Sequence, residues 1–172
     1  MKGVIPSCLN QLVVNKFGKD KWEAALKLAG LETTTTFLAF QDVPDEAVLK
    51  VVDSVCKVLN ITLEQAADAF GEYWVCTYGP GIYKTYYQRA ASAKEFLLKM
   101  DEVHRITTES IPNAQPPRFE YTWPDNKTLI MKYKSKRNLS VFMVGLVKGV
   151  GKYYKENLQV SKMGDDIKIV FF

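Results

Sequence analysis

Hydrophobic side chains recur every three to four residues through the first two-thirds of the chain, which is the spacing of amphipathic helices. Capping-box pairs, in which two side chains satisfy the first free N–H groups of a helix, open two of these segments at Thr62–Gln65 and Ser92–Glu95. Residues 31–44 are irregular and rich in threonine. Helices are expected over residues 4–17, 20–29, about 45–60, about 63–77, roughly 82–90 and about 92–111. Residues 42–44 open the third of these helices, and Gly-Pro-Gly at 79–81 ends the fourth.

After residue 111 the hydrophobic period shortens to two. Prolines exclude a helix across 112–117, because proline lacks an N–H and biases its predecessor to extended geometry. The expected strands are 118–123, 128–137, 158–162 and 167–172, with a glycine-rich helix at 139–155 that needs close packing. The sequence therefore predicts an α+β fold. A helical N-terminal subdomain, about 1–111, precedes a four-stranded antiparallel sheet with a packed helix, about 112–172, in one domain over 1–172.

Composition is that of an ordinary folded domain, with 47% hydrophobic and 24% charged residues among 172. No apolar run approaches the roughly 20 residues that span a bilayer, so no membrane insertion is expected. The N-terminus lacks the features of a secretion signal, and we expect a cytoplasmic protein. The three cysteines are too widely spaced for a zinc motif or a disulfide framework, and each is expected to be a buried, reduced thiol.

The single histidine, His104, falls on the apolar face of the predicted helix 92–111, beside Leu97 and Met100. One interpretation is a structural core histidine bonded to a backbone carbonyl. The other is an axial metal ligand, because a neutral imidazole binds iron well. No second histidine or cysteine pair accompanies it, which argues against a zinc or di-iron site.

Three hydrogen-bond donors alternate along the predicted strand 128–137, at Tyr133, Ser135 and Arg137. A guanidinium is a planar fork that suits a carboxylate, so this face suggests an anion site. The alternative is a structural ion pair between the arginine and an acid of the chain. The acids considered for that pair are Glu102, Glu109 and Glu120.

The lysines between these donors raise nucleic-acid binding as a further possibility. Lys132, Lys134 and Lys136 fall on the opposite, even-numbered face of the strand. A solvated strand face explains them more simply, and we expect no nucleic-acid partner.

Together these motifs resemble the H-NOX family, the haem nitric oxide/oxygen-binding domains that include the haem domain of soluble guanylate cyclase. Tyr133-x-Ser135-x-Arg137 resembles the motif that binds the haem propionates, and residues 101–104 resemble the segment with the proximal histidine. The start of the chain, the Pro116-Pro117-Arg118-Phe119 segment and the glycine-rich helix after Gly145 also fit. The resemblance covers essentially the whole chain.

The resemblance implies haem b (iron protoporphyrin IX) between the helical and the sheet parts. His104 would be the proximal iron ligand, and Tyr133, Ser135 and Arg137 would bind the propionates. Pro117 would press on the macrocycle. The residues that would line the distal pocket are Ile5, Leu9, Trp74, Tyr78, Phe142 and Leu146.

Phe142 occupies the position where family members that bind oxygen stably carry a tyrosine. A phenyl ring donates no hydrogen bond to bound oxygen, so the resemblance implies a protein that binds NO and CO without a durable oxygen complex. Trp74 and Tyr78 are donors that could reach a bound ligand. We expect Trp74 to fill space as an apolar body instead.

The function implied is a gas sensor rather than an enzyme. NO would weaken the bond between iron and His104, and the helical part would shift relative to the sheet part. A bacterial signalling protein such as a histidine kinase or a cyclic-di-GMP enzyme would respond to that shift. The alternatives are a sensor of oxygen or redox state and a peroxidase-like haem enzyme, although the expected pocket offers no distal acid or base.

Overall fold

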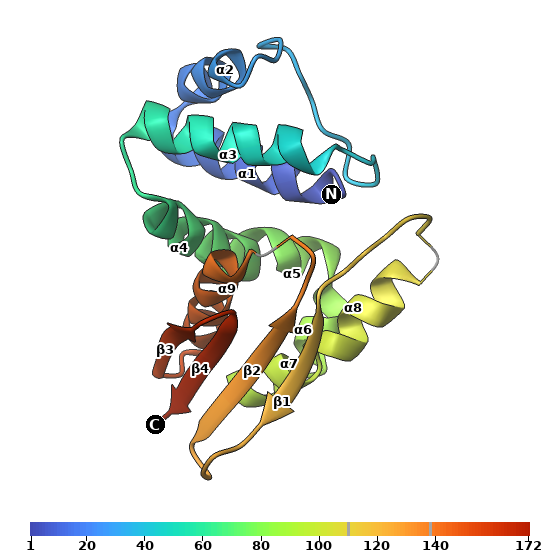
Figure 1. The fold of residues 1–172 in the computed structure, drawn as a ribbon, viewed down its shortest axis with the longest axis vertical. Coiled ribbons are helices and arrows are strands. Elements are labelled where there is room, and N and C mark those ends of the chain that lie inside the picture. The colour runs from blue at the N-terminus through green and yellow to red at the C-terminus, as the bar shows by residue number, and fades with distance from the viewer. Residues whose placement is uncertain (110, 138) are drawn as a thin grey trace. The chain divides into compact units, whose positions relative to one another are not determined.

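Residues 1–109, 111–137 and 139–172 are described by the computed structural model of this chain (Figure 1). It divides into two compact units, Met1–Ala66 and Ala67–Phe172. The boundary lies inside the helical region, so the later helices group with the sheet. The predicted change from helices to strands near residue 111 is therefore not the boundary between the compact units. The assignment of one domain to the whole chain stays a prediction.

Three helices make up most of the first unit: α1 (Val4–Phe17), α2 (Lys19–Leu28) and α3 (Asp45–Leu59). Gly18 has a φ of 96°, a conformation that glycine adopts without a Cβ clash, and it joins α1 to α2 as predicted. Residues 31–44 contain no helix, also as predicted. The apolar side chains buried in this unit include Cys8, Leu12, Val13, Trp22, Leu26, Val48, Val51 and Val55.

The next helix, α4 (Leu63–Tyr73), begins at the predicted capping box. The Thr62 N–H donates to Oε1 of Gln65 at 2.9 Å, and the Gln65 N–H donates to Oγ1 of Thr62 at 3.2 Å. Two otherwise free donors are thus satisfied reciprocally, which confirms this helix start.

Beyond α4 the helical path continues where the sequence predicted a stop. A π-helical turn, η1 (Trp74–Tyr78), leads into α5 (Gly79–Ile82), which α6 (Lys84–Gln88) follows. The expected end at Gly-Pro-Gly was wrong, because Pro80 lies in the first turn of α5, where its missing N–H removes no helical hydrogen bond. The π turn ends where the Gly79 N–H donates to the Trp74 carbonyl.

The long helix predicted over 92–111 is two helices, α7 (Ala93–Leu98) and α8 (Met100–Thr108). Its start is confirmed, since the Glu95 N–H donates to Oγ of Ser92 at 3.1 Å. Its continuity was wrong. In a continuous helix the Asp101 N–H would donate to the Leu97 carbonyl. Here both groups instead bond the hydroxyl of Tyr121, a residue of the sheet.

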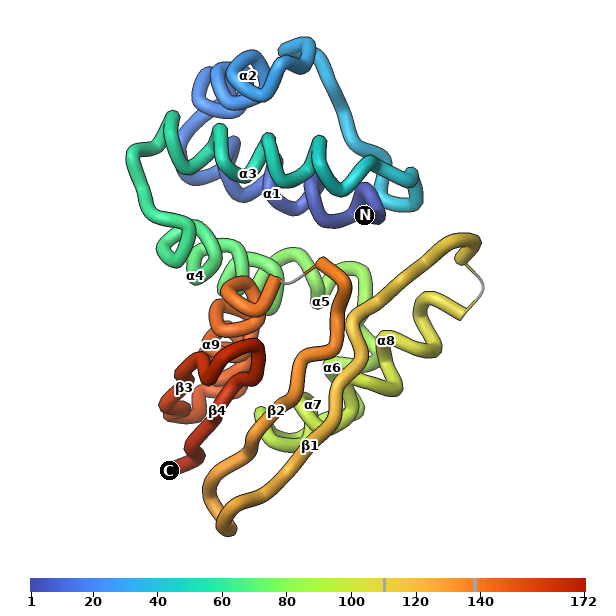
Figure 2. Tube along the Cα trace, in the orientation of Figure 1, coloured from blue at the N-terminus to red at the C-terminus, as the bar shows by residue number. Residues whose placement is uncertain are grey.

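Four antiparallel strands form the sheet: β1 (Arg118–Thr122), β2 (Thr128–Lys134), β3 (Leu158–Met163) and β4 (Asp166–Phe171). Their order is β1-β2-β4-β3, and this four-stranded antiparallel sheet confirms the predicted fold class. The trace in Figure 2 shows β1 and β2 as a long hairpin, with α8 running beside β1.

The second strand ends earlier than predicted, at Lys134. Ser135 and Arg137 therefore lie in the turn that follows the strand, rather than on its face. The cause is the end of β1, which pairs with β2 only as far as Arg118 opposite Lys134. Without a partner strand, the period-two arrangement stops.

The glycine-rich helix α9 (Ser140–Tyr154) packs closely, as its composition required. A Cβ on Gly145 would overlap the backbone carbonyl of Ala67, and one on Gly149 would press on the carbonyl of Gly71. Only glycine allows α9 to approach α4 so closely.

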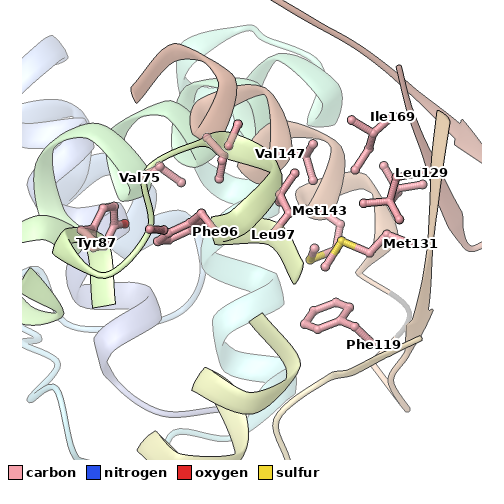
Figure 3. Close-up of a cluster of buried hydrophobic side chains, with 14 residues drawn as sticks. Val75, Tyr87, Phe96, Leu97, Phe119, Leu129, Met131, Met143, Val147 and Ile169 are labelled. Atoms are coloured by element: carbon pink, nitrogen blue, oxygen red, sulfur yellow. The ribbon is translucent and has the colours of Figure 1, made fainter. Parts of the chain in front are cut away.

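A buried apolar cluster lies between α7, α9 and the sheet (Figure 3). Leu97 of α7 lies beside Val147 and Met143 of α9, whereas Phe96 of the same helix lies next to Tyr87 (Figure 3). The sheet contributes the buried side chains Phe119, Leu129, Met131, Ile167 and Ile169. This core fixes α7 and α9 on one face of the sheet by burial of apolar surface.

The three cysteines are free thiols, as predicted. Cys8 is buried, whereas Cys56 and Cys76 are half-buried, so the expectation of burial was met at one position only. Among the helices of the described residues, none combines the length and the apolar character that crossing a membrane requires.

Candidate functional site

His104 lies on α8 with its ring partly accessible and its Nδ1 atom buried. Within the described part of the chain, this nitrogen has no hydrogen-bond partner. It therefore lacks the carbonyl that a purely structural histidine would contact. The imidazole lies against the ring of Phe119, with centroids 5.3 Å apart and planes 35° from parallel.

The protonation state of His104 suits a metal ligand. Burial lowers its pKa to about 4, while Asp101 raises it and Arg118 lowers it by smaller amounts. The imidazole is therefore neutral at neutral pH and keeps a lone pair on one ring nitrogen. Neutral imidazole is the form that coordinates iron.

An ion pair attaches the first turn of α8 to β1. Nε and Nη2 of Arg118 donate to the two carboxylate oxygens of Asp101 at 2.8 and 2.6 Å. The Phe119 N–H donates to the same carboxylate at 2.8 Å. The Arg118 hydrogen bonds are the main cause that lowers the pKa of Asp101 to about 2. His104 thus lies one helical turn beyond Asp101, whose carboxylate accepts three hydrogen bonds from β1.

The three predicted propionate ligands lie at the end of β2 and just beyond it. The Tyr133 ring lies 6.0 Å from that of Phe119, so three rings, from His104 through Phe119 to Tyr133, follow one another. The Arg137 N–H donates to Oγ of Ser135 at 3.2 Å, and Nη1 of Arg137 donates to the Gln115 carbonyl at 2.7 Å. The bond to the Gln115 carbonyl therefore orients the guanidinium.

The acids proposed as structural partners of Arg137 have other surroundings. Glu109 pairs with Arg105 at 3.5 Å, and Glu120 pairs with Lys134. Glu102 is exposed on α8. These contacts leave a structural ion pair of Arg137 as an alternative to the propionate site.

A second group of predicted residues is aromatic. Phe70 of α4 contacts both Trp74 and Phe142, each at 5.8 Å between centroids. Trp74 also lies 5.5 Å from Tyr78, which shares the π turn with it. Trp74 and Leu146 both pack against the buried cluster, so Trp74 does have apolar contacts. Turns of π-helix often occur at functional sites.

Three predicted residues are not joined to these groups by the described contacts. Ile5 and Leu9 lie on α1 in the first compact unit, half-buried and buried respectively. Pro117 is half-buried, directly before β1. Their proposed places beside a haem stay predictions.

Two residues near His104 were missed by sequence reasoning. Phe119 lies between the imidazole and Tyr133, and Tyr121 contacts Asp101 at the start of α8. The alternation of Phe119 and Tyr121 on the predicted strand would have placed both on its inner face. Nothing local indicated which helix they would meet.

The residues present fit an iron porphyrin. Among the described residues, the buried Nδ1 of His104 has no hydrogen-bond partner, and the Phe119 ring contacts both this imidazole and the Tyr133 ring. Ser135 and Arg137, which follow Tyr133, are hydrogen-bond donors. A haem requires this combination, an axial nitrogen for iron and donors for two carboxylates.

Comparison with known proteins agrees with this chemistry. Two curated relatives from Caenorhabditis elegans are soluble guanylate cyclase gcy-35, 26% identical over 167 residues, and soluble guanylate cyclase gcy-34, 30% identical over 166 residues. These alignments cover 95% and 94% of this chain and 24% of each relative. The chain thus spans about a quarter of the length of the curated relatives it matches.

Solved structures share the fold. An oxygen-binding H-NOX domain related to soluble guanylate cyclases has a TM-score of 0.82 at 23% identity, covering 99% of this chain and 95% of that one. A Cs H-NOX mutant that carries 4-cyano-phenylalanine has a TM-score of 0.86 at 23% identity, covering 99% and 96%.

The sequence model described as haem-NO-binding matches residues 2–162, nearly the whole chain. The chain therefore belongs to the haem-NO-binding family, the H-NOX domains, which are haem-based gas sensors related to soluble guanylate cyclase.

Proposed function

We propose that this chain senses nitric oxide at a ferrous haem b, binds carbon monoxide at the same position, and passes the signal to a partner protein. The observation that carries the proposal is the buried Nδ1 of His104, which has no partner among the described residues, in a ring that is neutral at neutral pH. Membership of the haem-NO-binding family supports the same cofactor.

Four side chains would hold the haem in this proposal. His104 would donate a ring nitrogen to iron, and the planar fork of Arg137 would bind a propionate. Tyr133 and Ser135 would add hydroxyl donors for the carboxylates. The bond from Arg137 to the Gln115 carbonyl supports this assignment, because it restricts the guanidinium before any carboxylate arrives. Pro117 would contact the macrocycle.

Selectivity for NO would come from the distal residues. Phe142 packs against Phe70 and carries no hydroxyl, so it offers no hydrogen bond to bound oxygen. Trp74 has aromatic neighbours in Phe70 and Tyr78, which supports its role as an apolar body. Ile5, Leu9 and Leu146 would complete an apolar lining.

Signalling would pass through the attachment of His104. His104 would hold the haem iron from α8, and the haem would supply the position at which a diatomic gas binds. Weakening of the bond between iron and His104 would be the response to NO. Release of His104 would leave α8 held by its contacts to β1 alone. A partner protein that binds α8 differently when His104 is bonded to iron and when it is not would respond to the signal. We propose a bacterial histidine kinase or cyclic-di-GMP enzyme as that partner.

The absorption spectrum of the reduced protein tests the proposal. NO and CO should each change the haem spectrum, whereas air should leave no durable oxygen complex. A stable oxygen spectrum would refute the selectivity and favour the oxygen-sensor alternative. Purified protein that takes up no haem would refute the sensor function itself.

A further inference from the structure

The helix that carries His104 begins at a break where one side chain bonds two backbone groups. The Leu97 carbonyl and the Asp101 N–H are four residues apart, the spacing of partners in a continuous α-helix. In this structure both bond the hydroxyl of Tyr121 instead. That hydroxyl donates to the Leu97 carbonyl at 2.8 Å and accepts from the Asp101 N–H at 3.4 Å.

Tyr121 reaches this position from the middle of β1. It lies opposite Met131 of β2 and packs against the buried cluster, so its ring is fixed on the side of the sheet that faces the helices. Burial raises its pKa to about 12, so the hydroxyl keeps the proton that it donates to Leu97. Insertion of a side-chain group into a helical hydrogen bond is a known cause of a sharp bend.

The other attachments of α8 also come from β1. Asp101 bonds Arg118 and the Phe119 N–H, and His104 lies against the Phe119 ring. By contrast, in the part of the chain that the structure describes, no residue of α8 belongs to the buried core and only Met100 packs against its edge. Polar contacts to one strand, rather than apolar burial, therefore set the direction of α8.

We propose that Tyr121 is a positioning residue for His104: its inserted hydroxyl holds the break between α7 and α8 and so fixes how the imidazole is presented to the haem iron. The effect on the iron rests on the proposed function, whereas the break does not. Without the hydroxyl, the Leu97 carbonyl and the Asp101 N–H are free to bond each other. The two helices then join into one, and His104 moves with α8.

The Tyr121→Phe variant tests this, because it removes the hydroxyl and keeps the buried ring. Tyr154→Phe is the matched control: Tyr154 on α9 also donates its hydroxyl to a backbone carbonyl, that of Tyr87, at 3.2 Å. Residual dipolar couplings on the purified protein, with any haem in its diamagnetic ferrous carbonyl form, give the angle between α7 and α8. Resonance Raman spectra of the ferrous haem give the iron–histidine stretching band.

We expect Tyr121→Phe to bring the two helix axes towards one line and to shift the iron–histidine band, with neither change in Tyr154→Phe. A Tyr121→Phe protein with the wild-type angle would overturn the inference, as would a straightened helix with an unshifted band. Equal changes in both variants would also overturn it, because they would indicate a general loss of packing.

If Tyr121→Phe does not fold, the wild-type protein still provides a test. The Tyr121 hydroxyl proton should exchange slowly with water and show a nuclear Overhauser effect to the Asp101 amide. Exchange as fast as in free tyrosine would overturn the inference. The helix angle and this proton are measurable without iron, so a failure of the haem assignment is distinguishable from a failure of the break.

Discussion

Arg118 and Asp101 form a two-bond ion pair that joins β1 to the helix of His104. The carboxylate also accepts the Phe119 N–H, and its pKa is lowered from 3.8 to about 2. A group with a lowered pKa in the folded state stabilises the protein above its unfolded pKa. That contribution is lost as the pH falls through the folded value.

The first prediction concerns acid stability. Between about pH 4 and pH 2 the unfolded chain binds a proton at Asp101 before the folded protein does, so stability should fall as the pH falls. Asp101→Asn removes this dependence and should show a shallower slope over that window. Denaturant unfolding at a series of pH values measures it. A slope equal to that of the wild type would contradict the prediction.

Replacement of His104 by glycine should remove the iron ligand of the proposed site. The variant should require added imidazole to give a normal haem spectrum, because free imidazole replaces the missing nitrogen. Absorption spectra of the reduced variant with and without imidazole check this. Retention of a five-coordinate ferrous spectrum without imidazole would refute the assignment of His104.

Replacement of Arg137 by alanine should weaken haem retention. The guanidinium is held by the Gln115 carbonyl and would contribute a charge-assisted hydrogen bond to a propionate, worth about 1.5–3 kcal/mol. Melting curves with and without haem separate the possible results. A loss confined to the haem-loaded protein supports a propionate ligand. An equal loss in both forms would identify a structural arginine.

Replacement of Phe142 by tyrosine should add a donor to the aromatic group around Phe70. A hydrogen bond to bound oxygen should lengthen the life of the oxygen complex on the order of tenfold or more. The decay of that complex after exposure of reduced protein to air measures it. Phe172→Tyr makes the same change at an exposed position and should have no effect. Equal lifetimes in Phe142→Tyr and wild type would count against a distal place for residue 142.

Replacement of Gly145 by alanine should destabilise the contact between α9 and α4. The new Cβ would overlap the Ala67 carbonyl, and overpacking of this kind costs about 1–3 kcal/mol. Gly81→Ala is the control, because a Cβ there meets nothing within 4 Å. The free energies of unfolding of both variants, measured in denaturant, should differ by that amount. An undiminished stability in Gly145→Ala would show that α9 moves aside at no cost.

The sequence by itself determined most of the local structure, because local signals depend on near neighbours. The capping box of Thr62 and Gln65 and the glycine turn at Gly18 join residues a few positions apart. The residue types at His104, Tyr133, Ser135 and Arg137 left structural alternatives open. Their resemblance, with other segments of the chain, to the motifs of the H-NOX family predicted the haem. Period-two and helical patterns gave the order of helices and strands, because these patterns also depend on near neighbours.

Tertiary structure alone decided where those elements break. The predicted helix over 92–111 is divided by Tyr121, which lies 24 residues from Leu97 and 20 from Asp101. Ser135 and Arg137 left the strand because β1, a distant segment, ended its pairing at Arg118. Helical propensity favours the unbroken helix, and only a hydroxyl brought in by the packed sheet offers those backbone groups another partner. The direction of the helix that carries His104 is therefore a property of the folded sheet.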